Sequence, residues 1–472
     1  MSALDRRLIE IVPSPRQLAL EQMEFYAFVH FTVNTFTDRE WGDGSESPAV
    51  FNPVKLDADQ WVSAIRAAGM KGLILTCKHH DGFCLWPSRH TAHSVAASPW
   101  KNGQGDVVAE VSAACHRAGL RFGVYLSPWD RHDPRYGSGQ PYNDYFIAQL
   151  TELLTNYGDI FAVWFDGACG EGPNGRKQVY DWPRYYETIR RLQPGACIHV
   201  CGPDVRWCGN EAGDTRAAEW SVVPRRTQDT EKIKEASQQT DDAAFRQRKI
   251  SAADQDLGSR ELLRDEPELV WYPAEVNTSI RPGWFWHASE DDRVKPLEKL
   301  IDIYEKSVGG NATFLLNIPP TKDGLFHDND VQRLLAFGQY LADCYGTNHV
   351  ESAASLTATP AAPGHGIVCA RTPDERCYLP LSEETPVDIT LRWDTPITFR
   401  RIVMMEQITL SQRVERWAVD VLRDGQWQEA AAGQVIGYKR IVVLPPTAAC
   451  ALRIRIGDAR VAPTLKFLGV YA

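Results

Sequence analysis

The segment "DIFAVWFDG" (Asp159–Gly167) decides the fold, because it joins an apolar run to a single acid. Residues 161–165 are all apolar or aromatic, which is typical of a strand buried on both faces, as in a parallel sheet. A buried strand seldom ends in a carboxylate without a reason. Asp166 either begins a turn or is held at the strand tip for chemistry, and the rest of the chain has to distinguish these alternatives.

Similar apolar segments alternate with helical patterns over the first three quarters of the chain. The predicted strands are Phe25–Val33, Gly72–His80, Arg121–Pro128, Asp159–Gly167, 197–203 and Ala312–Pro320. The helical patterns cover residues 57–70, 106–120, 143–158, 182–195 and 296–311. This alternation predicts an α/β fold with a parallel sheet covered by helices.

Two architectures fit the alternation: a doubly wound open sheet and a (β/α)8-like TIM barrel. No glycine-rich phosphate loop follows the first strand, which weakens the dinucleotide-binding version of the open sheet. Polar and titratable residues instead follow several strands, where a barrel collects its active site. These residues are His30, His79, His80, Tyr125 and Asp166. The sequence therefore favours the barrel.

The pattern changes after about Cys344. A segment rich in Pro, Ala, Ser and Thr (351–366) reads as a link, and short alternating strands without a convincing helix follow it. We predict a barrel over residues 1–346 and a C-terminal β-sandwich over residues 347–472. Within the barrel, residues 225–268 are polar and read as a partly helical excursion that could cover the mouth of a site.

Composition narrows the class of protein. The 472 residues carry a net charge of −10, which argues against nucleic acid or an anionic membrane as the main partner. No stretch is long enough to span a membrane, so we expect a cytoplasmic protein, or an exported one whose leader has been removed. The eleven cysteines are scattered, which favours reduced, buried thiols. The sequence leaves the oligomeric state open.

The cluster "KHHDGF" (residues 78–83) has two interpretations. Cys77, His79, His80 and Cys84, or else Cys197, Cys201 and Cys208, could bind a metal in a metal-dependent hydrolase. Their spacing lacks the C-x-x-C pairs or the H-E-x-x-H pattern of zinc sites, and adjacent strand residues point to opposite faces. We therefore predict no metal. The histidines are either satisfied structural residues or neutral donors to sugar hydroxyls.

Acids elsewhere in the chain complete a possible site. Glu40 and Trp41 follow the first strand, and a carboxylate beside an aromatic ring suits a sugar, although such a pair is also common on any surface. Glu211, Asp214 and Glu219 lie in a later segment, where each alone could be a solvated loop acid. Two carboxylates from different strand ends, with histidines and aromatics, indicate acid/base hydrolysis of a glycosidic bond.

Several motifs in order over about 320 residues carry a family resemblance. They are "FVHFTVNTF", "EWGDG", "KHHDGF", "GVYLSPWDRH", "VWFDGA", "RWCGNEAGDTRAAEWSVVP", "RPGWFWH" and "LLNIPPTKDG". Together they resemble the α-L-fucosidases of glycoside hydrolase family twenty-nine. "HFTVNTFTDREWG" and "GNEAGDTR" with "EWSVVP" look closest to the subfamily that prefers α-1,3/1,4-linked fucose. That family combines a (β/α)-type barrel with a β-sandwich.

The resemblance implies a role for each candidate residue. Asp166 matches the nucleophile and Glu211 the general acid/base. Glu219 is the reserve candidate for the acid/base role. Residues that match or would complete the fucose pocket are His30, Glu40, Trp41, His79, His80, Tyr125, Trp164 and one of Trp284 or Trp286. The implied reaction is retaining exo-hydrolysis of a fucosylated oligosaccharide without a cofactor.

One alternative of another class is a catalytically silent fucose-binding protein on the same scaffold. It predicts that one carboxylate is missing, whereas Asp166 and Glu211 are both present. For the β-sandwich we expect a structural role, and binding of sugar or a calcium ion there is left open.

Overall fold

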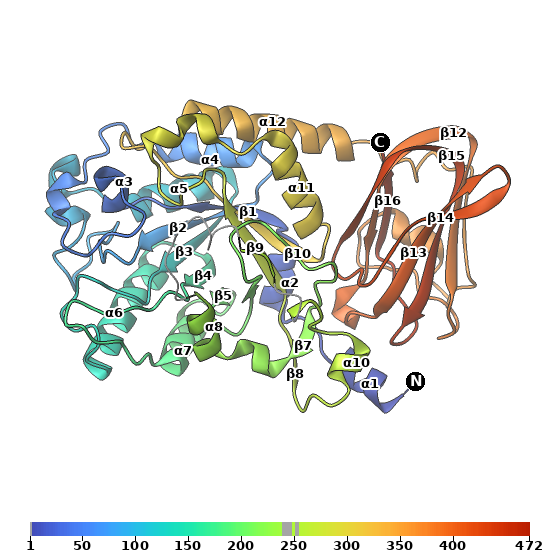
Figure 1. Ribbon diagram of the computed structural model, residues 1–472, viewed down its shortest axis with the longest axis horizontal. Helices are drawn as coiled ribbons and strands as arrows, with labels where there is room; N and C mark the ends of the chain where they lie inside the picture. Colours follow the sequence, from blue (N-terminus) through green and yellow to red (C-terminus); the bar gives the residue numbers. More distant parts are fainter. Residues whose placement is uncertain (1, 238–247, 251–253) are drawn as a thin grey trace.

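Eight parallel strands form a nearly closed barrel in the first part of the chain (Figure 1). The computed structural model describes residues 2–237, 248–250 and 254–472. The strand order around the sheet is β5-β4-β3-β2-β1-β10-β9-β6. The bounds are β1 Phe25–Val29, β2 Gly72–Lys78, β3 Arg121–Leu126, β4 Ile160–Phe165, β5 Cys197–Val200, β6 Arg206–Trp207, β9 Ala274–Ser279 and β10 Ala312–Asn317. The barrel prediction is therefore confirmed.

The barrel closes weakly at one place. β5 and β6 are the two ends of the sheet order, and β6 has only two residues. A single parallel bridge, His199 to Val205, and a hydrogen bond from the Val200 amide to the Val205 carbonyl (3.0 Å) link the two ends. Neither β6 nor β9 is among the predicted strands.

Helices follow most strands and cover the outside of the sheet. They are α4 Ala58–Ala67, α5 Val107–Ala118, α6 Gln140–Asn156, α7 Trp182–Leu192, α11 Leu297–Ser307 and α12 Asp328–Tyr345. In α5, the Asp106 carboxylate accepts from the Ala109 amide (2.9 Å), and Gly119 ends the helix with a φ of 72°. A capping acid and a terminal glycine are the ordinary start and stop of a helix.

Shorter elements surround this core. They are α1 Ala3–Ile9, α2 Pro15–Glu21, α3 Val33–Thr37, α8 Thr230–Ser237, α10 Arg260–Leu263, and the antiparallel pair β7 Val222–Pro224 and β8 Leu269–Trp271. The predicted excursion at 225–268 is thus partly helical where it is described. Residues 238–247 and 251–253 of that prediction lie outside the described residues.

The C-terminal part is an antiparallel β-sandwich with its own apolar core. Its strands are β11 Ser355–Ala358, β12 Val387–Met405, β13 Val414–Arg423, β14 Gln426–Gly433, β15 Arg440–Ala459 and β16 Phe467–Tyr471. β12 and β15 are long, not short as predicted, because register shifts in their pairing let each bend and continue. The predicted link also contains a strand, β11, which pairs with β12.

The sandwich packs against the barrel beside the start of β10 (Figure 1). Asn311 spans this junction: its Nδ2 donates to the Glu219 carbonyl (2.7 Å), and its Oδ1 accepts from the Tyr438 amide (2.6 Å). Arg401 of the sandwich also pairs with Glu305 of α11 (2.5 Å). Within the described part of the chain, no helix has the length and apolar character needed to cross a bilayer.

Candidate active site

A pocket opens at the carboxyl ends of the barrel strands and encloses about 630 Å³, including its open mouth. Nine of the eleven predicted site residues line it: His30, Glu40, Trp41, His79, His80, Trp164, Asp166, Glu211 and Trp284. Tyr125 and Trp286 are not in its lining.

Asp166 directly follows β4 and is held in a fixed orientation. Its Oδ1 accepts from the Ala168 amide (2.8 Å), and its Oδ2 accepts from the Tyr125 hydroxyl (2.9 Å). Burial raises the pKa of Asp166 above its ordinary value, and these two hydrogen bonds act in the opposite direction. Tyr125 therefore lies behind the carboxylate, as a support, and not in the pocket wall.

His30 presents a hydrogen-bond acceptor on its Nε2 atom. The Asn317 Nδ2 donates to the Ser279 hydroxyl (2.9 Å) and to the Trp284 carbonyl (2.8 Å), which identifies Asn317 Oδ1 as the acceptor facing His30. His30 Nδ1 lies 2.9 Å from this oxygen and must donate to it. The neutral ring then carries its lone pair on Nε2.

His80 has the same tautomer for a similar reason. The single hydroxyl proton of Ser127 goes to the Trp129 carbonyl (2.7 Å), so His80 Nδ1 must donate to Ser127 Oγ (2.7 Å). His80 Nε2 lies 3.8 Å from Asp166 Oδ2, which is too long for a hydrogen bond. This separation is expected when both atoms are hydrogen-bond acceptors. The prediction of neutral donors is therefore wrong for His80, which offers an acceptor.

All three pocket histidines are neutral near pH 7. Burial lowers the pKa of His30 to about 4 and that of His80 to about 3. It also lowers the pKa of His79 well below the ordinary value. Among the described residues, His79 Nδ1 is a buried nitrogen without a hydrogen-bond partner. The histidines offer polar contacts without placing a charge beside Asp166.

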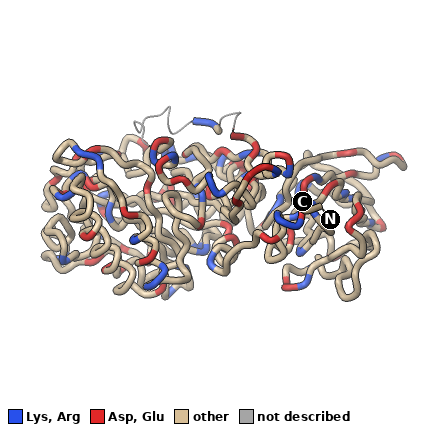
Figure 2. The backbone as a smooth tube through the Cα atoms, turned by 90° about the horizontal axis from the view of Figure 1, so that it is seen from below, with Lys and Arg blue, Asp and Glu red and all other residues tan. Residues whose placement is uncertain are grey.

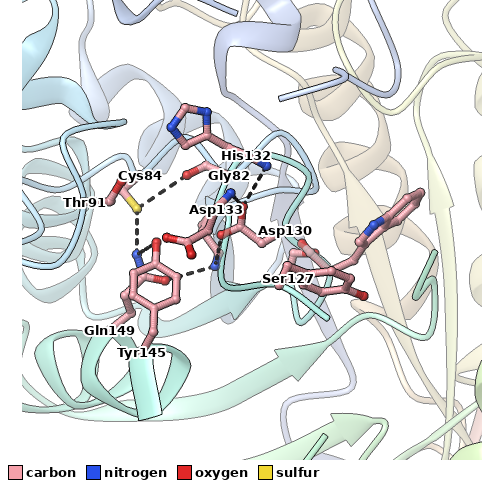
Figure 3. Close-up of polar contacts among 12 residues, drawn as sticks. Gly82, Cys84, Thr91, Ser127, Asp130, His132, Asp133, Tyr145 and Gln149 are labelled. Atoms are coloured by element: carbon pink, nitrogen blue, oxygen red, sulfur yellow. Dashed lines mark hydrogen bonds and ion pairs between the residues drawn. The ribbon is translucent and has the colours of Figure 1, made fainter. Parts of the chain in front are cut away.

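A buried polar network supports the turn that carries His79 and His80. Lys78 Nζ pairs with Asp130 Oδ2 and donates to Gln149 Oε1, both at 3.0 Å. Figure 3 shows Gln149 donating onward to Cys84 Sγ (3.2 Å) and to the Tyr145 hydroxyl (2.8 Å). Buried, fully partnered polar groups of this kind hold the turn in one conformation.

The same network lies close to the next loop of the barrel. In Figure 3 the Asp130 carboxylate accepts from the amides of His132 (3.0 Å) and Asp133 (2.9 Å). Gly82 completes the turn with a φ of 77°, and a Cβ there would lie 2.5 Å from Asp130 Oδ1. The sequence pattern "DGF" therefore requires glycine at this position.

Glu211 enters the pocket from the loop that follows β6. Gly209 and Gly213 have positive φ values, and the Asn210 Oδ1 accepts from the amides of Ala212 and Asp214 at 3.0 Å. These turns direct Glu211 to the Trp284 indole, whose Nε1 donates to Glu211 Oε2 (2.9 Å).

Glu219 does not lie in the pocket, so the reserve assignment is wrong. Its carboxylate is fully buried between Arg206 (2.6 Å) and Arg216 (3.2 Å). Burial alone would raise the pKa of Glu219, but the two guanidinium groups hold it at about 2. A carboxylate with these partners stays ionised and braces the loop that bears Glu211.

Glu40 fastens the loop that carries Trp284. Its carboxylate accepts from the amides of Trp284 (2.8 Å) and Phe285 (3.1 Å), and from His287 Nε2 (2.7 Å). The hydrogen bond to Glu40 raises the pKa of His287 to about 9. Trp286 points elsewhere, since its Nε1 donates to Asp291 (3.0 Å). Of the two predicted tryptophans, Trp284 is the one in the pocket.

The floor of the pocket rests on a carboxylate that the sequence reasoning missed. Glu275 is fully buried and accepts from Trp164 Nε1 (2.7 Å), His199 Nδ1 (2.9 Å) and the Tyr26 hydroxyl (2.5 Å). Other lining residues not predicted are Phe28, Gly167, Ala168, Val200, Trp207, Ser237 and Asn277. The alternation of Glu275, Asn277 and Ser279 in "AEVNTS" is the signal for a strand with a polar inner face.

Side chains that could bind a metal come together at one place in the described part of the chain. Within the described ranges, only His79, His80 and Asp166 bring three ligand atoms within 4.8 Å of one another. Neither predicted cysteine set does so. Burial raises the pKa of Cys77, Cys84, Cys197, Cys201 and Cys208, which disfavours the thiolate that a metal needs. The metal-site interpretation of the cysteines is therefore not supported.

Comparisons with a family model and with a known protein give the same family. A family model described as α-L-fucosidase matches residues 17–346. The chain is 36% identical to α-L-fucosidase 1 of Arabidopsis thaliana, over 98% of this chain and 87% of that protein.

Solved structures agree with this match. A Bacteroides ovatus protein is 45% identical with a TM-score of 0.85, over 100% of this chain and 76% of that one. A Ruminococcus gnavus fucosidase in complex with fucose is 29% identical with a TM-score of 0.84, over 98% and 95%.

Proposed function

The chain belongs to the α-L-fucosidase family and is a glycoside hydrolase of that kind, and we propose that it removes terminal α-1,3/1,4-linked fucose with retention of configuration. The main support is that Asp166 and Glu211, from distant segments, line one pocket. Retaining enzymes need two carboxyl groups about 5–5.5 Å apart across the anomeric carbon. The linkage preference rests on the subfamily resemblance.

In the first step Asp166 attacks the anomeric carbon and forms a covalent fucosyl-enzyme. The bond to the leaving oxygen breaks, and Glu211 donates its proton to that oxygen. The amide of Ala168 and the hydroxyl of Tyr125 hold Asp166 in place and favour its ionised form despite burial.

In the second step Glu211 removes a proton from water, and the water oxygen attacks the anomeric carbon. The bond to Asp166 breaks, and the carboxylate is restored. Trp284, which donates to Glu211 Oε2, keeps the acid/base on this side of the pocket.

Fucose would be held by uncharged groups. His30 and His80 offer Nε2 acceptors for sugar hydroxyls, and Trp41 lies edge-on to His80 with ring centres 5.4 Å apart. Fucose carries a methyl group where most hexoses carry a hydroxymethyl group. The aromatic walls from Phe28, Trp164 and Trp284 suit that methyl group.

The test compares wild type, Asp166→Ala and Glu211→Ala on 3-fucosyllactose, a Lewis trisaccharide and 2′-fucosyllactose. Asp166→Ala should lose activity by about 10³-fold or more, because no covalent intermediate can form. Glu211→Ala should lose activity on natural sugars and regain it with azide on an aryl fucoside, whose leaving group needs no proton.

Four results would contradict this proposal in whole or in part. Full activity in either variant means that the residue is misassigned. Equal cleavage of 2′-fucosyllactose removes the linkage preference. Initial release of β-fucose, seen by NMR, means inversion. If the wild type binds fucose but hydrolyses none of these substrates, the protein is the catalytically silent fucose-binding alternative.

A further inference from the structure

A second cavity, which encloses about 1280 Å³ including its open mouth, adjoins the pocket and shares two residues with it, Glu211 and Trp284. Its other walls come from the end of β9, from the loop after it, from the short helix Ala288–Arg293 and from the beginning of α11. The cavity thus borders the pocket at Glu211, the residue proposed as proton donor.

The lining of this cavity carries more basic than acidic side chains. Its acids are Glu211 and Glu290, and its cations are Lys249, Arg281, Arg293, Lys295 and Lys299. The whole chain carries a net charge of −10, and acidic and basic residues are interspersed along the backbone in Figure 2. The lining of this cavity thus has the opposite charge balance to the whole chain.

Two of these cations have structural partners. Arg281 is fully buried, pairs with Asp330 (2.9 Å) and Asp291 (2.8 Å), and so is already neutralised. Lys295 Nζ donates to the Ser279 carbonyl (2.6 Å), which fixes it against the end of β9. Their role is to hold the wall of the cavity.

Arg293 and Lys299 are better placed to meet a ligand. Arg293 is exposed, and no acid of the described residues lies within 4.0 Å of its guanidinium nitrogens. Lys299 is half exposed, and the one acid of the described residues within 4.0 Å of its ammonium group is Asp302, at 3.6 Å. Exposed pairs of this length are worth little, so a bound anion could compete for the ammonium group.

The position of the cavity identifies the part of the substrate that it would take. The leaving oxygen must lie within hydrogen-bond reach of Glu211 to receive the proton, so the sugar attached to it extends past Glu211. We propose that this cavity is the leaving-group subsite and that Arg293 and Lys299 bind an anionic substituent there. This inference rests on the fucosidase function proposed above.

Two sources of the anion share this chemistry: a sulfate ester on the leaving saccharide, and the carboxylate of an acidic sugar linked to it. The experiment uses three substrates, which are a neutral fucosylated trisaccharide, its sulfated form and its form extended by an acidic sugar. The measured quantity is the ratio of kcat/KM for each anionic substrate to that for the neutral one.

We expect at least one anionic substrate to be preferred about fivefold by the wild type at low salt, the order that one or two exposed ion contacts supply. Raising the salt should reduce the ratio, since salt screens exposed charges. Arg293→Gln/Lys299→Gln should bring the ratio close to one. The control Arg400→Gln/Arg423→Gln removes the same charge from the exposed surface of the sandwich and should keep the ratio.

A wild-type ratio of one or less for both anionic substrates would overturn the inference. So would an unchanged ratio in Arg293→Gln/Lys299→Gln, or an equal loss in the sandwich control. Failure of the proposed function is a separate result: the wild type would then release no fucose from the neutral trisaccharide or from an aryl fucoside.

Discussion

Asp166 and Tyr125 form the contact on which the chemistry most depends at the scale of single residues. Burial raises the pKa of Asp166, whereas the nucleophilic role that we propose for it requires the ionised form. The Tyr125 hydroxyl, 2.9 Å from Oδ2, stabilises the ionised form. Because the nearby His30 and His80 are neutral, neither supplies a positive charge that would stabilise the Asp166 carboxylate.

Tyr125→Phe is predicted to move the acidic limb of the kcat/KM profile to higher pH. Loss of the hydroxyl removes a donor to the carboxylate, so the pKa of Asp166 rises further and more alkaline solution is needed to ionise it. Activity at the optimum should also fall by about tenfold, the effect of one hydrogen bond to a charged group. The measurement is a pH profile on an aryl fucoside.

Tyr186→Phe is the matched control, because its hydroxyl donates to the Cys201 carbonyl (2.9 Å), away from the pocket lining. Its acidic limb should coincide with that of the wild type. An acidic limb that stays in place in Tyr125→Phe would show that this hydrogen bond does not set the ionisation of Asp166.

Among the elements, the loop after β9 links the two halves of the site. Its residues Trp284, Phe285 and His287 are all bound to Glu40, which follows β1. The pKa of His287 is about 9, above its ordinary value near 6.5, so the folded state holds the proton more tightly than the unfolded chain. This stabilisation is complete below about pH 6.5 and is lost as the pH rises through 9.

His287→Gln is therefore predicted to cost more stability at neutral pH than at high pH. The difference in Tm between wild type and variant should be largest near pH 6.5 and should shrink towards pH 10. His365→Gln is the control, at a histidine of the sandwich whose Nδ1 lies 3.0 Å from the Cys377 carbonyl, and it should show no such trend. A difference in Tm that does not change with pH would contradict the assignment.

The same elements show what the sequence could and could not predict. Apolar runs that end in polar residues identified β1 to β4 and the positions of His30, His79, His80 and Asp166, because a buried strand exposes chemistry only at its tip. β9 was missed because its inner face is polar, and Glu275 was missed with it. The tautomers of His30 and His80 depend on Asn317 and Ser127, contacts that only folding creates.

At the scale of the whole molecule, Asn311 joins barrel, loop and sandwich. It is buried, has a φ of 67°, and bonds to Glu219, Ser221 and Tyr438. Its Glu219 contact also connects the sandwich to the loop that bears Glu211. The sandwich is therefore bound to the segment that supports Glu211, the proposed proton donor.

Asn311→Ala is predicted to lower the free energy of unfolding by about 2–4 kcal/mol, because it leaves the Glu219 carbonyl and the Tyr438 amide buried without partners. Chemical denaturation of the full chain measures this. Asn102→Ala is the control, since Asn102 also has a positive φ (55°) but is exposed. Equal losses in both variants would assign the cost to backbone conformation alone.

The weak join between β5 and β6 has a consequence for how this enzyme can diverge. The strand that bears Asp166 has neighbours on both sides, β3 and β5, so insertions there would break two ladders. The Glu211 segment follows a two-residue strand at the edge of the sheet, so an insertion there would disturb one ladder, that with β9. Preferences for new leaving groups can therefore evolve through changes along this edge of the sheet, while the strands on either side of β4 and the residues around Asp166 stay unaltered.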